Sequence, residues 1–145
     1  MASVKAVCIS EKKGTRKSEV PSIKVLVGHG IVGDAHAGNW HRQISLLAKE
    51  SIDKIKKTGL ELTHGAFAEN IVTEGIELTK LPVGTKLKIG NTILEVTQIG
   101  KECHNDCEIK KISGECVMPR EGIFAIVLLD GEIFPEDRIE IMESL

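Results

Sequence analysis

The chain is poor in aromatic side chains: one tryptophan, three phenylalanines and no tyrosine, or 3% of its 145 residues. Aromatic side chains bury the largest apolar area per residue in most protein cores. Their scarcity excludes an interior built on stacked rings, so isoleucine, valine and leucine must fill most of it. Hydrophobic residues of all kinds make up 41% of the chain, which is enough for one sizeable core at this length.

Strong net charge and long apolar runs are also missing. The formal net charge is −2 at pH 7, so the chain lacks the broad basic field with which proteins bind nucleic acids. No segment approaches the roughly 20 apolar residues of a membrane span, and MASVKAVCIS lacks the apolar centre of a signal peptide. We therefore expect a cytoplasmic protein with reduced cysteines and with neither a nucleic-acid nor a membrane partner. The basic cluster EKKGTRK is expected to be a solvated loop.

Most of the periodic segments alternate between apolar and polar residues, as strands do, for example SVKAVCI, SIKVLV, QISLL, ENIVTEG and DRIEIM. TKLKIGNTILEVTQI predicts a hairpin turning at Gly90-Asn91, and GIFAIVLLDGEIF predicts another turning at Asp130-Gly131. The clearest helix covers residues 48–58, with lysines in its last turns and Gly59 after them. Many short strands with one or two short helices predict a single, mainly β domain over residues 1–145, folded as a closed or nearly closed β-barrel.

The glycine-rich segment GDAHAGNWHRQISLL is the first candidate for chemistry, because it leads into a strand and binding groups collect at such positions. His36 can act as a ligand, an acid or a hydrogen-bond donor. Arg42 can hold a phosphate or an oxyanion through its planar guanidinium. Alternatively, Asp34 and His36 only brace a tight turn, and the spacing alone gives the two interpretations similar weight.

The pair Glu69-Asn70, in THGAFAENIVTEG, is the second candidate. A carboxylate and an amide at the start of an apolar strand can hydrogen-bond the edge of a ligand ring. Alternatively, Asn70 holds a turn through hydrogen bonds to the local backbone. This pattern alone is weakly specific.

The third candidate is GKECHNDCEIKKISGECVMPREGIFA, which holds three of the four cysteines. Cys103 and Cys107 have a spacing found in zinc sites, and His104 and Cys116 would complete a set of four ligands. However, structural zinc sites usually use two close pairs of ligands, and Cys116 has no neighbouring partner. Zinc therefore stays an alternative.

A reactive thiol is the other interpretation of this segment. Cations near a cysteine favour the nucleophilic thiolate, and Arg120 lies close to Cys116. Glu115 and Glu121 act in the opposite sense, so the sequence leaves the sign of the effect open. Cys8 lies on an apolar strand face and is expected to be an ordinary core residue.

Four segments in a fixed order resemble the MOSC domain family, named after the C-terminal domain of molybdenum cofactor sulfurases. They are GDAHAGNWHRQISLL, GAFAENIVTEGIEL, GTKLKIGNTILEVTQIGKEC and MPREGIFAIVL, and the resemblance runs from about VKAVCIS to DRIEIM. It implies a small, stand-alone member of bacterial type, with a β-barrel core and a role in handling sulfur for metal–sulfur cofactors. Larger relatives bind the molybdenum cofactor and reduce N-hydroxylated compounds.

The resemblance also implies roles for particular residues. Cys116, just before EGIFAIVL, matches the family cysteine that carries sulfur as a persulfide or ligates molybdenum. Cys103 is the second choice, because GKEC also matches the family. The remaining expected cofactor-binding residues are Arg42 and Arg120 for the phosphate of molybdopterin, His36 and Asn70 for the pterin edge or an oxo group, and also Asp34 and Glu69.

The expected function is therefore to bind the molybdenum cofactor or to carry sulfur for its maturation. The sequence shows no counterpart of the pyridoxal-phosphate domain of the large sulfurases, so we expect a sulfur donor such as a cysteine desulfurase and a molybdoenzyme as acceptor. The alternative is a small zinc-stabilised β-barrel that binds a partner and uses Cys103, Cys107 and Cys116 as ligands. A cysteine–histidine hydrolase using Cys116 ranks last, because the sequence shows no oxyanion hole.

Overall fold

The computed structural model describes residues 2–11, 17–35, 37–50, 69–99 and 122–142. Eleven strands, one 3-10 turn and two helical residues, Lys49 and Glu50, lie within these ranges, and no helix there is long and apolar enough to cross a membrane. The elements are β1 (Ser3–Ile9), β2 (Ser18–Val20), β3 (Ile23–Leu26), β4 (Gly30–Ile31), β5 (Ile44–Ala48), β6 (Ile71–Glu74), η1 (Leu78–Lys80), β7 (Lys86–Ile89), β8 (Thr92–Ile99), β9 (Ile123–Leu129), β10 (Gly131–Ile133) and β11 (Ile139–Met142).

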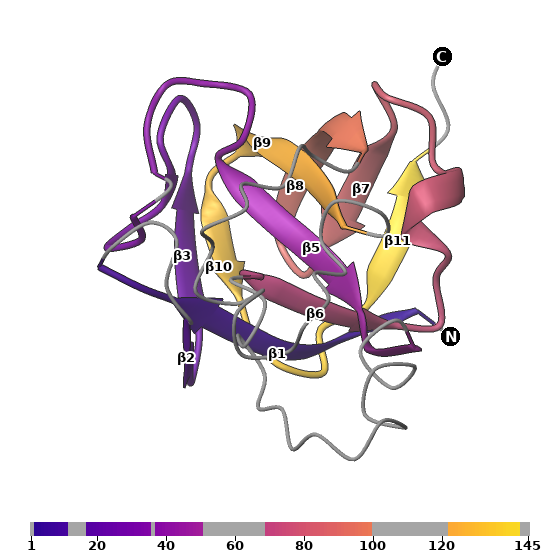
Figure 1. Cartoon of the computed structure of the whole chain (residues 1–145), viewed down its shortest axis with the longest axis horizontal. Helices are drawn as coiled ribbons and strands as arrows, with labels where there is room; N and C mark the ends of the chain where they lie inside the picture. Colours follow the sequence, from indigo (N-terminus) through magenta and orange to yellow (C-terminus); the bar gives the residue numbers. More distant parts are fainter. Residues whose placement is uncertain (1, 12–16, 36, 51–68, 100–121, 143–145) are drawn as a thin grey trace, which may run out of the picture.

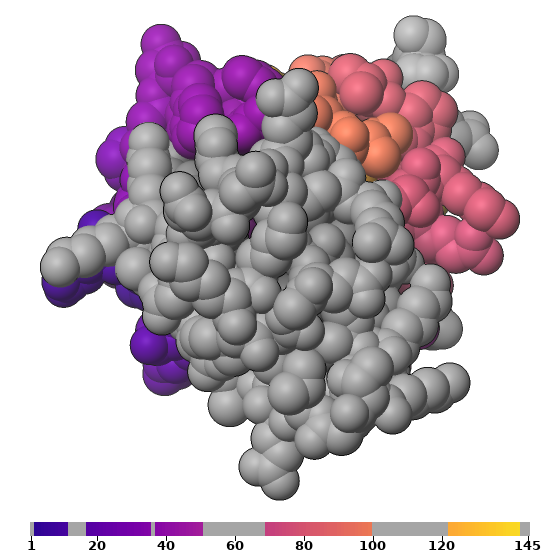
Figure 2. Space-filling model, in the orientation of Figure 1, coloured from indigo at the N-terminus to yellow at the C-terminus, as the bar shows by residue number. Residues whose placement is uncertain are grey.

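These strands form two sheets. The larger has the order β11-β7-β8-β9-β5-β6-β1-β2, and the smaller has the order β10-β3-β4. Only β5 and β6 pair in parallel among the described strands, so the larger sheet is mixed. Figure 1 shows β5 between β9 and β6, with β1 on the far side of β6. In the space-filling view, the segment before β5, in purple, and the segment from η1 to β8, in pink and orange, form the upper corners of this face (Figure 2).

The mainly β fold predicted from the alternating segments is confirmed, but the closed barrel is wrong, because both sheets are open. The larger sheet ends at β11 on one side and at β2 on the other. Among the described residues, the start of β1 and the chain around the start of β11 share one isolated bridge, Ser3 with Arg138. Three backbone hydrogen bonds accompany it: Val4 N–H to Asp137 O at 2.8 Å, Glu136 N–H to Val4 O at 2.7 Å and Ile139 N–H to Ala2 O at 3.0 Å. These contacts do not form a continuous ladder, so the two ends of the larger sheet meet at one point without closing into a barrel.

The interior is aliphatic, as the shortage of aromatic residues predicts. The core cluster contains only valine, isoleucine, leucine and alanine. Strict alternation produces this cluster, as in β7, where Leu87 and Ile89 are buried and Lys86 and Lys88 are exposed. Phe124 is the one buried aromatic side chain in the described ranges, and it lies outside the core cluster.

The predicted turns have different outcomes. Gly90-Asn91 joins β7 to β8, and Gly90 has a φ of 57°, which glycine adopts without steric cost. Asp130-Gly131 does not make a hairpin, because β10 leaves β9 and pairs with β3 instead. The Asp130 carboxylate accepts a hydrogen bond from the Val27 N–H at 2.7 Å, which ties the turn to the end of β3. Ala48, the first residue of the predicted helix 48–58, ends β5, whereas the next two residues, Lys49 and Glu50, are helical as predicted. Residues 51–58 lie outside the described ranges.

Every residue of β5, Ile44–Ala48, is buried. Ile44 and Leu46 belong to the core cluster, whereas Ser45 and Leu47 alternate with them and face the other side of the sheet. Ser45 and Leu47 are only 4% and 0% exposed. The middle of the sheet is therefore buried on both faces, and a polar side chain there needs a hydrogen-bond partner within the protein.

Candidate functional site

Ser45 finds its partner in Asn70, which lies just before β6. Asn70 Oδ1 accepts from the Ser45 N–H at 3.0 Å and from Ser45 Oγ at 3.2 Å, and Asn70 Nδ2 donates to Cys8 O at 3.0 Å. The Asn70 N–H donates to Ser45 Oγ at 3.0 Å, and the Cys8 N–H donates to Asn70 O at 2.7 Å. We call Ser45, Asn70 and Cys8 the Asn70 bracket. It joins β5, β6 and β1 on the second, buried face of the sheet.

The bracket gives Asn70 a different role from the local turn that the sequence left open, because its side chain bonds to two other strands. Asn70 is fully buried, and most of its hydrogen-bonding capacity is used by Ser45 and Cys8. Contact between Asn70 and a cofactor stays a prediction.

Replacing Asn70 by alanine should lower the free energy of unfolding by about 2–3 kcal/mol, because it leaves the Ser45 N–H and the Cys8 carbonyl buried without their side-chain partner. Chemical denaturation followed by circular dichroism measures this change. Asn91→Ala is the matched control, since the Asn91 side chain accepts from the Glu132 N–H in an exposed turn. A loss for Asn70→Ala no larger than for Asn91→Ala would contradict the role of the bracket.

Arg42 lies just before β5 and reaches the end of β8. Its Nε donates to Gln98 Oε1 at 3.1 Å, and its guanidinium carbon lies 5.4 Å from the centre of the Phe124 ring. The ring face and the hydrogen bond hold the partly buried guanidinium in one position. Within the described part of the chain, Nη1 and Nη2 of Arg42 have no hydrogen-bond partner. Arg42 is therefore able to offer these groups to an anionic oxygen.

Gln98 and His41 complete the surroundings of Arg42. His41 Nε2 lies 3.0 Å from Gln98 Oε1, the same oxygen that accepts from Arg42. Arginine only donates, so Gln98 must present its oxygen to Arg42 and not its amide nitrogen. In neutral His41 the hydrogen is therefore on Nε2, and Nδ1 is left as an acceptor.

Asp34 is buried and balanced by Lys17. Lys17 Nζ donates to Asp34 Oδ1 at 2.7 Å and to Ser10 Oγ at 3.1 Å, and the Ser10 N–H donates to Asp34 Oδ1 at 3.1 Å. The side chains of Lys17 and Asp34 are both 0% exposed. The solvated loop expected for EKKGTRK is thus wrong at Lys17, its last residue, because the ammonium is enclosed against Asp34. Asp34 braces the segment after β4 against the end of β1, and its contact with a cofactor stays a prediction.

Glu69 and Cys8 lie at the same end of the sheet and are both fully buried. Burial raises the pKa of the Cys8 thiol far above its usual range, and the carboxylates of Glu69 and Glu19 raise it further, whereas Lys17 acts to lower it. Cys8 is therefore an inert, protonated thiol, as the sequence predicts for a core position. The role of Glu69 in binding a cofactor stays a prediction.

The remaining predicted site residues lie outside the described ranges: His36, His104, Cys103, Cys107, Cys116 and Arg120. The strands on either side of residues 100–121 are described, and there Ile99 of β8 pairs with Ile123 of β9. Ile123 pairs with Leu46 of β5, and Leu46 pairs with Ile71 of β6. Gln98, Ser45 and Asn70 are the chain neighbours of Ile99, Leu46 and Ile71 in this row of paired residues. Among the described residues, no three histidine, cysteine, aspartate or glutamate side chains group as a metal site.

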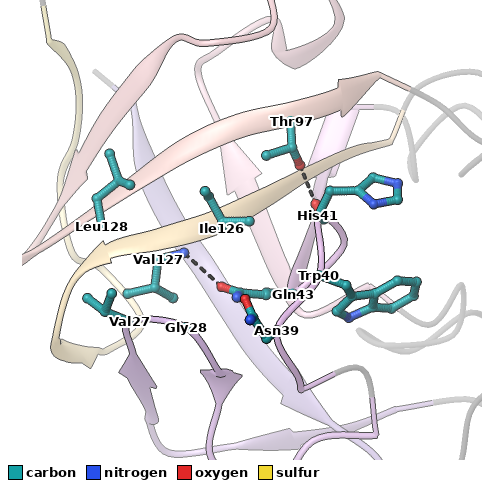
Figure 3. A pocket seen from close by; sticks show the side chains of 10 residues that line it. All are labelled: Val27, Gly28, Asn39, Trp40, His41, Gln43, Thr97, Ile126, Val127 and Leu128. Carbon is teal, nitrogen blue, oxygen red and sulfur yellow. Dashed lines mark hydrogen bonds between the residues drawn. The ribbon is translucent and has the colours of Figure 1, made fainter.

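A cavity of about 380 Å³ is lined by His41 and Gln43, the two chain neighbours of Arg42. The tip of the β3–β4 hairpin, the segment before β5, β8 and β9 contribute its walls (Figure 3). Sequence reasoning missed this cavity and also missed Gln98, Lys17 and Gln43. The sequence contains one feature that indicates a site here: Gln43 and Ser45 are polar residues at the start of an otherwise apolar strand.

Comparison with known proteins identifies the family. The family model for the MOSC domain matches residues 33–140. The fold is similar to that of the YuaD protein of Bacillus subtilis (TM-score 0.78, 19% identity, 100% of this chain and 98% of that one). It is also similar to YiiM of Geobacillus stearothermophilus (TM-score 0.77, 18% identity, 99% of this chain and 76% of that one). A third similar structure is YiiM of Escherichia coli (TM-score 0.69, 15% identity, 99% of this chain and 71% of that one).

At these identities the structural likeness shows a shared fold, and no curated protein sequence matches the chain. The match to the family model carries more weight, because residues 33–140 make up most of the 145-residue chain, and they include Asp34, Arg42, Glu69 and Asn70. The chain therefore belongs to the MOSC domain family.

Proposed function

We propose that this protein binds the molybdenum cofactor, or carries sulfur for the maturation of metal–sulfur cofactors, with Cys116 as the working thiol. The observation that carries the proposal is Arg42. It is a cation held by Gln98 and Phe124, with donor groups to spare, beside the strands that lead into and out of the cysteine-bearing segment. A role in reducing N-hydroxylated compounds would follow from cofactor binding.

The described residues fit such a cofactor unequally. Molybdopterin carries a phosphate, and a fixed guanidinium is suited to its oxygens. Asn70 fits less well as a pterin partner, because its amide already bonds to Ser45 and Cys8. The negative charge of Asp34 is likewise already balanced by the Lys17 ammonium, so Asp34 also fits less well. When bound, the cofactor supplies a metal with soft sulfur ligands, which suits a cysteine thiolate. Arg42 would orient the phosphate, and the Asn70 bracket would hold the strands beneath it.

Sulfur carriage requires a donor, and a persulfide on a cysteine desulfurase has the right chemistry. The Cys116 thiolate attacks the outer sulfur of that persulfide. A new S–S bond forms on Cys116, the S–S bond of the donor breaks, and the donor cysteine leaves as a thiolate. The transferred sulfur keeps its oxidation state, so no further oxidant is needed. A molybdoenzyme under maturation would be the acceptor.

Intact-protein mass spectrometry tests sulfur carriage. After incubation with a cysteine desulfurase and cysteine, the protein should gain the mass of one sulfur atom, and peptide mapping should locate it on Cys116. Elemental analysis of the same preparation tests the zinc alternative. Stoichiometric zinc without a gain in sulfur or binding of molybdenum cofactor would favour the zinc-stabilised binding module and overturn the proposal.

Replacing Arg42 by glutamine should weaken binding of molybdenum cofactor released from a molybdoenzyme by about tenfold or more, because a hydrogen bond to a charged group is worth about 1.5–3 kcal/mol. Arg42→Lys keeps the charge but loses the planar fork, so its effect should be intermediate. Equilibrium dialysis with molybdenum analysis measures both. Arg138→Gln is the matched control, because Arg138 is an exposed arginine beside Glu140. Equal affinities for the Arg42 and Arg138 variants would remove Arg42 from the site.

A further inference from the structure

The cavity beside His41 contains a buried polar side chain, that of Gln43, which has no role in the proposed molybdenum cofactor site. Gln43 is only 3% exposed, and its Oε1 accepts a hydrogen bond from the Val127 N–H at 3.0 Å. This bond fixes the orientation of the amide, because a backbone N–H needs an acceptor. The Nε2 group of Gln43 must then carry the two donor hydrogens. Figure 3 shows the Gln43 amide extending from the residue just before β5 toward Val127, among the lining residues.

Nε2 of Gln43 has no hydrogen-bond partner within the described part of the chain. Nε2 is not one of the side-chain atoms that are fully enclosed and lack a partner, so part of it stays accessible. Gln43 also lines the cavity. A ligand in the cavity can therefore reach this group, on a side chain that is otherwise buried. A donor in this position favours a ligand with a carbonyl oxygen, because an unsatisfied buried donor costs about 1–3 kcal/mol when the cavity is filled with apolar atoms.

The other walls limit the ligand further. The ten described lining residues include no lysine, arginine, aspartate or glutamate, so the ligand should be neutral. Asn39 is an exposed lining residue whose side-chain amide has no hydrogen-bond partner in the described ranges, so its oxygen can accept from a ligand N–H. Apolar contact comes from Val27, Ile126 and Leu128. A volume of about 380 Å³ is near the lower end for small-molecule sites, which suits a single ring or a short chain.

We propose that this cavity is a second binding site, for a small neutral amide or lactam, beside the proposed molybdenum cofactor site, with His41 contributing to both. The ligand carbonyl accepts from Gln43 Nε2, its N–H donates to the Asn39 side-chain oxygen, and its hydrocarbon part packs on Ile126 and Leu128. The site needs neither cofactor nor sulfur, so its test is independent of the proposed function.

Nuclear magnetic resonance with the full chain and δ-valerolactam as probe tests this site. Trp40 is the only tryptophan and lines the cavity, so the single indole N–H signal reports on occupancy. The Trp40 signal and the Gln43 side-chain amide signals should shift saturably, with a dissociation constant of about 1 mM, as expected for a ligand with so few atoms. Tetrahydropyran, a ring of the same size without the amide, should bind at least tenfold more weakly. Equal binding of the two probes, or no saturable shift with the lactam, would overturn the proposal.

Two variants locate the binding. Gln43→Glu keeps the acceptor for the Val127 N–H but replaces the donor by an oxygen, so lactam binding should be lost. Asn39→Ala changes an exposed residue and should weaken binding about threefold to tenfold while the protein stays folded. Thr85→Ala, in an exposed turn away from the cavity, is the control and should bind like the unmodified protein. The site would also be refuted by unchanged lactam binding in both single variants, Asn39→Ala and Gln43→Glu. Should Gln43→Glu fail to fold, Asn39→Ala alone still tests the site.

Discussion

Replacing Lys17 by methionine should lower the free energy of unfolding by about 3–5 kcal/mol, because it removes the cation that balances a buried carboxylate. Lys17 Nζ lies 2.7 Å from Asp34 Oδ1, and neither side chain is exposed to solvent. Methionine has a similar length and no charge, so the change tests the ion pair more than the packing. Denaturant titration measures the loss as a lower midpoint at an unchanged slope.

A double-mutant cycle separates the charge effect from the loss of contacts. Asp34→Asn keeps an oxygen that can accept from the Ser10 N–H and removes the negative charge. The double variant Lys17→Met/Asp34→Asn should therefore recover much of the stability lost by Lys17→Met alone. Lys5→Met is the surface control, because the Lys5–Glu74 pair is partly exposed at 28% and 41% and should contribute at most about 1 kcal/mol. Similar losses for Lys17→Met and Lys5→Met would show that burial does not strengthen the Lys17–Asp34 pair.

The case of Lys17 shows where sequence reasoning stops. Lys17 ends a run of charged residues, and such a run is solvated in most proteins. Its partner, Asp34, lies 17 residues later and reaches it only because β3 and β4 return the chain to the end of β1. Local composition contains no information about that return. The burial of the pair is a consequence of tertiary structure.

The strands themselves are predictable, because alternation of apolar and polar residues is a local pattern. β1, β3, β7, β8 and β11 all lie where the alternation indicates. Pairing is not local, and this explains the errors in the barrel and in the second hairpin. β10 follows β9 by one residue, yet its partner is β3, about a hundred residues earlier in the chain. Asp130 stabilises that choice by accepting from the Val27 N–H.

In the candidate site, too, local features were predictable from the sequence and contacts between distant strands were not. Arg42 and Asn70 were identified by residue type and position, since a guanidinium and an amide beside a strand are typical of binding sites. Their surroundings were not predictable: Gln98 and Phe124 hold Arg42 from two other strands, and Ser45 and Cys8 use the amide of Asn70. The partners of a side chain depend on the order of strands in the sheet, which the sequence pattern does not contain.

Changing Cys116 to serine should abolish persulfide loading and molybdenum cofactor binding while the protein stays folded. Serine keeps the size of the side chain but not the nucleophilic sulfur on which both activities depend. Cys103→Ser and Cys107→Ser are the matched controls, because both cysteines lie in the same segment as Cys116. The sequence also predicts that these two cysteines pack inside the protein, since Cys103 follows the strand TILEVTQI and Cys107 begins the segment CEIKKIS. Both control variants should still load sulfur.

Cys8 provides an internal control in every variant. Its thiol is buried and its pKa is raised by burial, so it should acquire no sulfur in the folded protein. Sulfur found on Cys8 would indicate unfolding during the experiment. Peptide mapping after loading then distinguishes the remaining outcomes. Loading that survives Cys116→Ser but is lost in Cys103→Ser would assign the sulfur-carrying role to Cys103. Unfolding with release of zinc in each of the three variants of this segment would make Cys103, Cys107 and Cys116 zinc ligands, because a structural zinc site loses stability with any one of its thiolates.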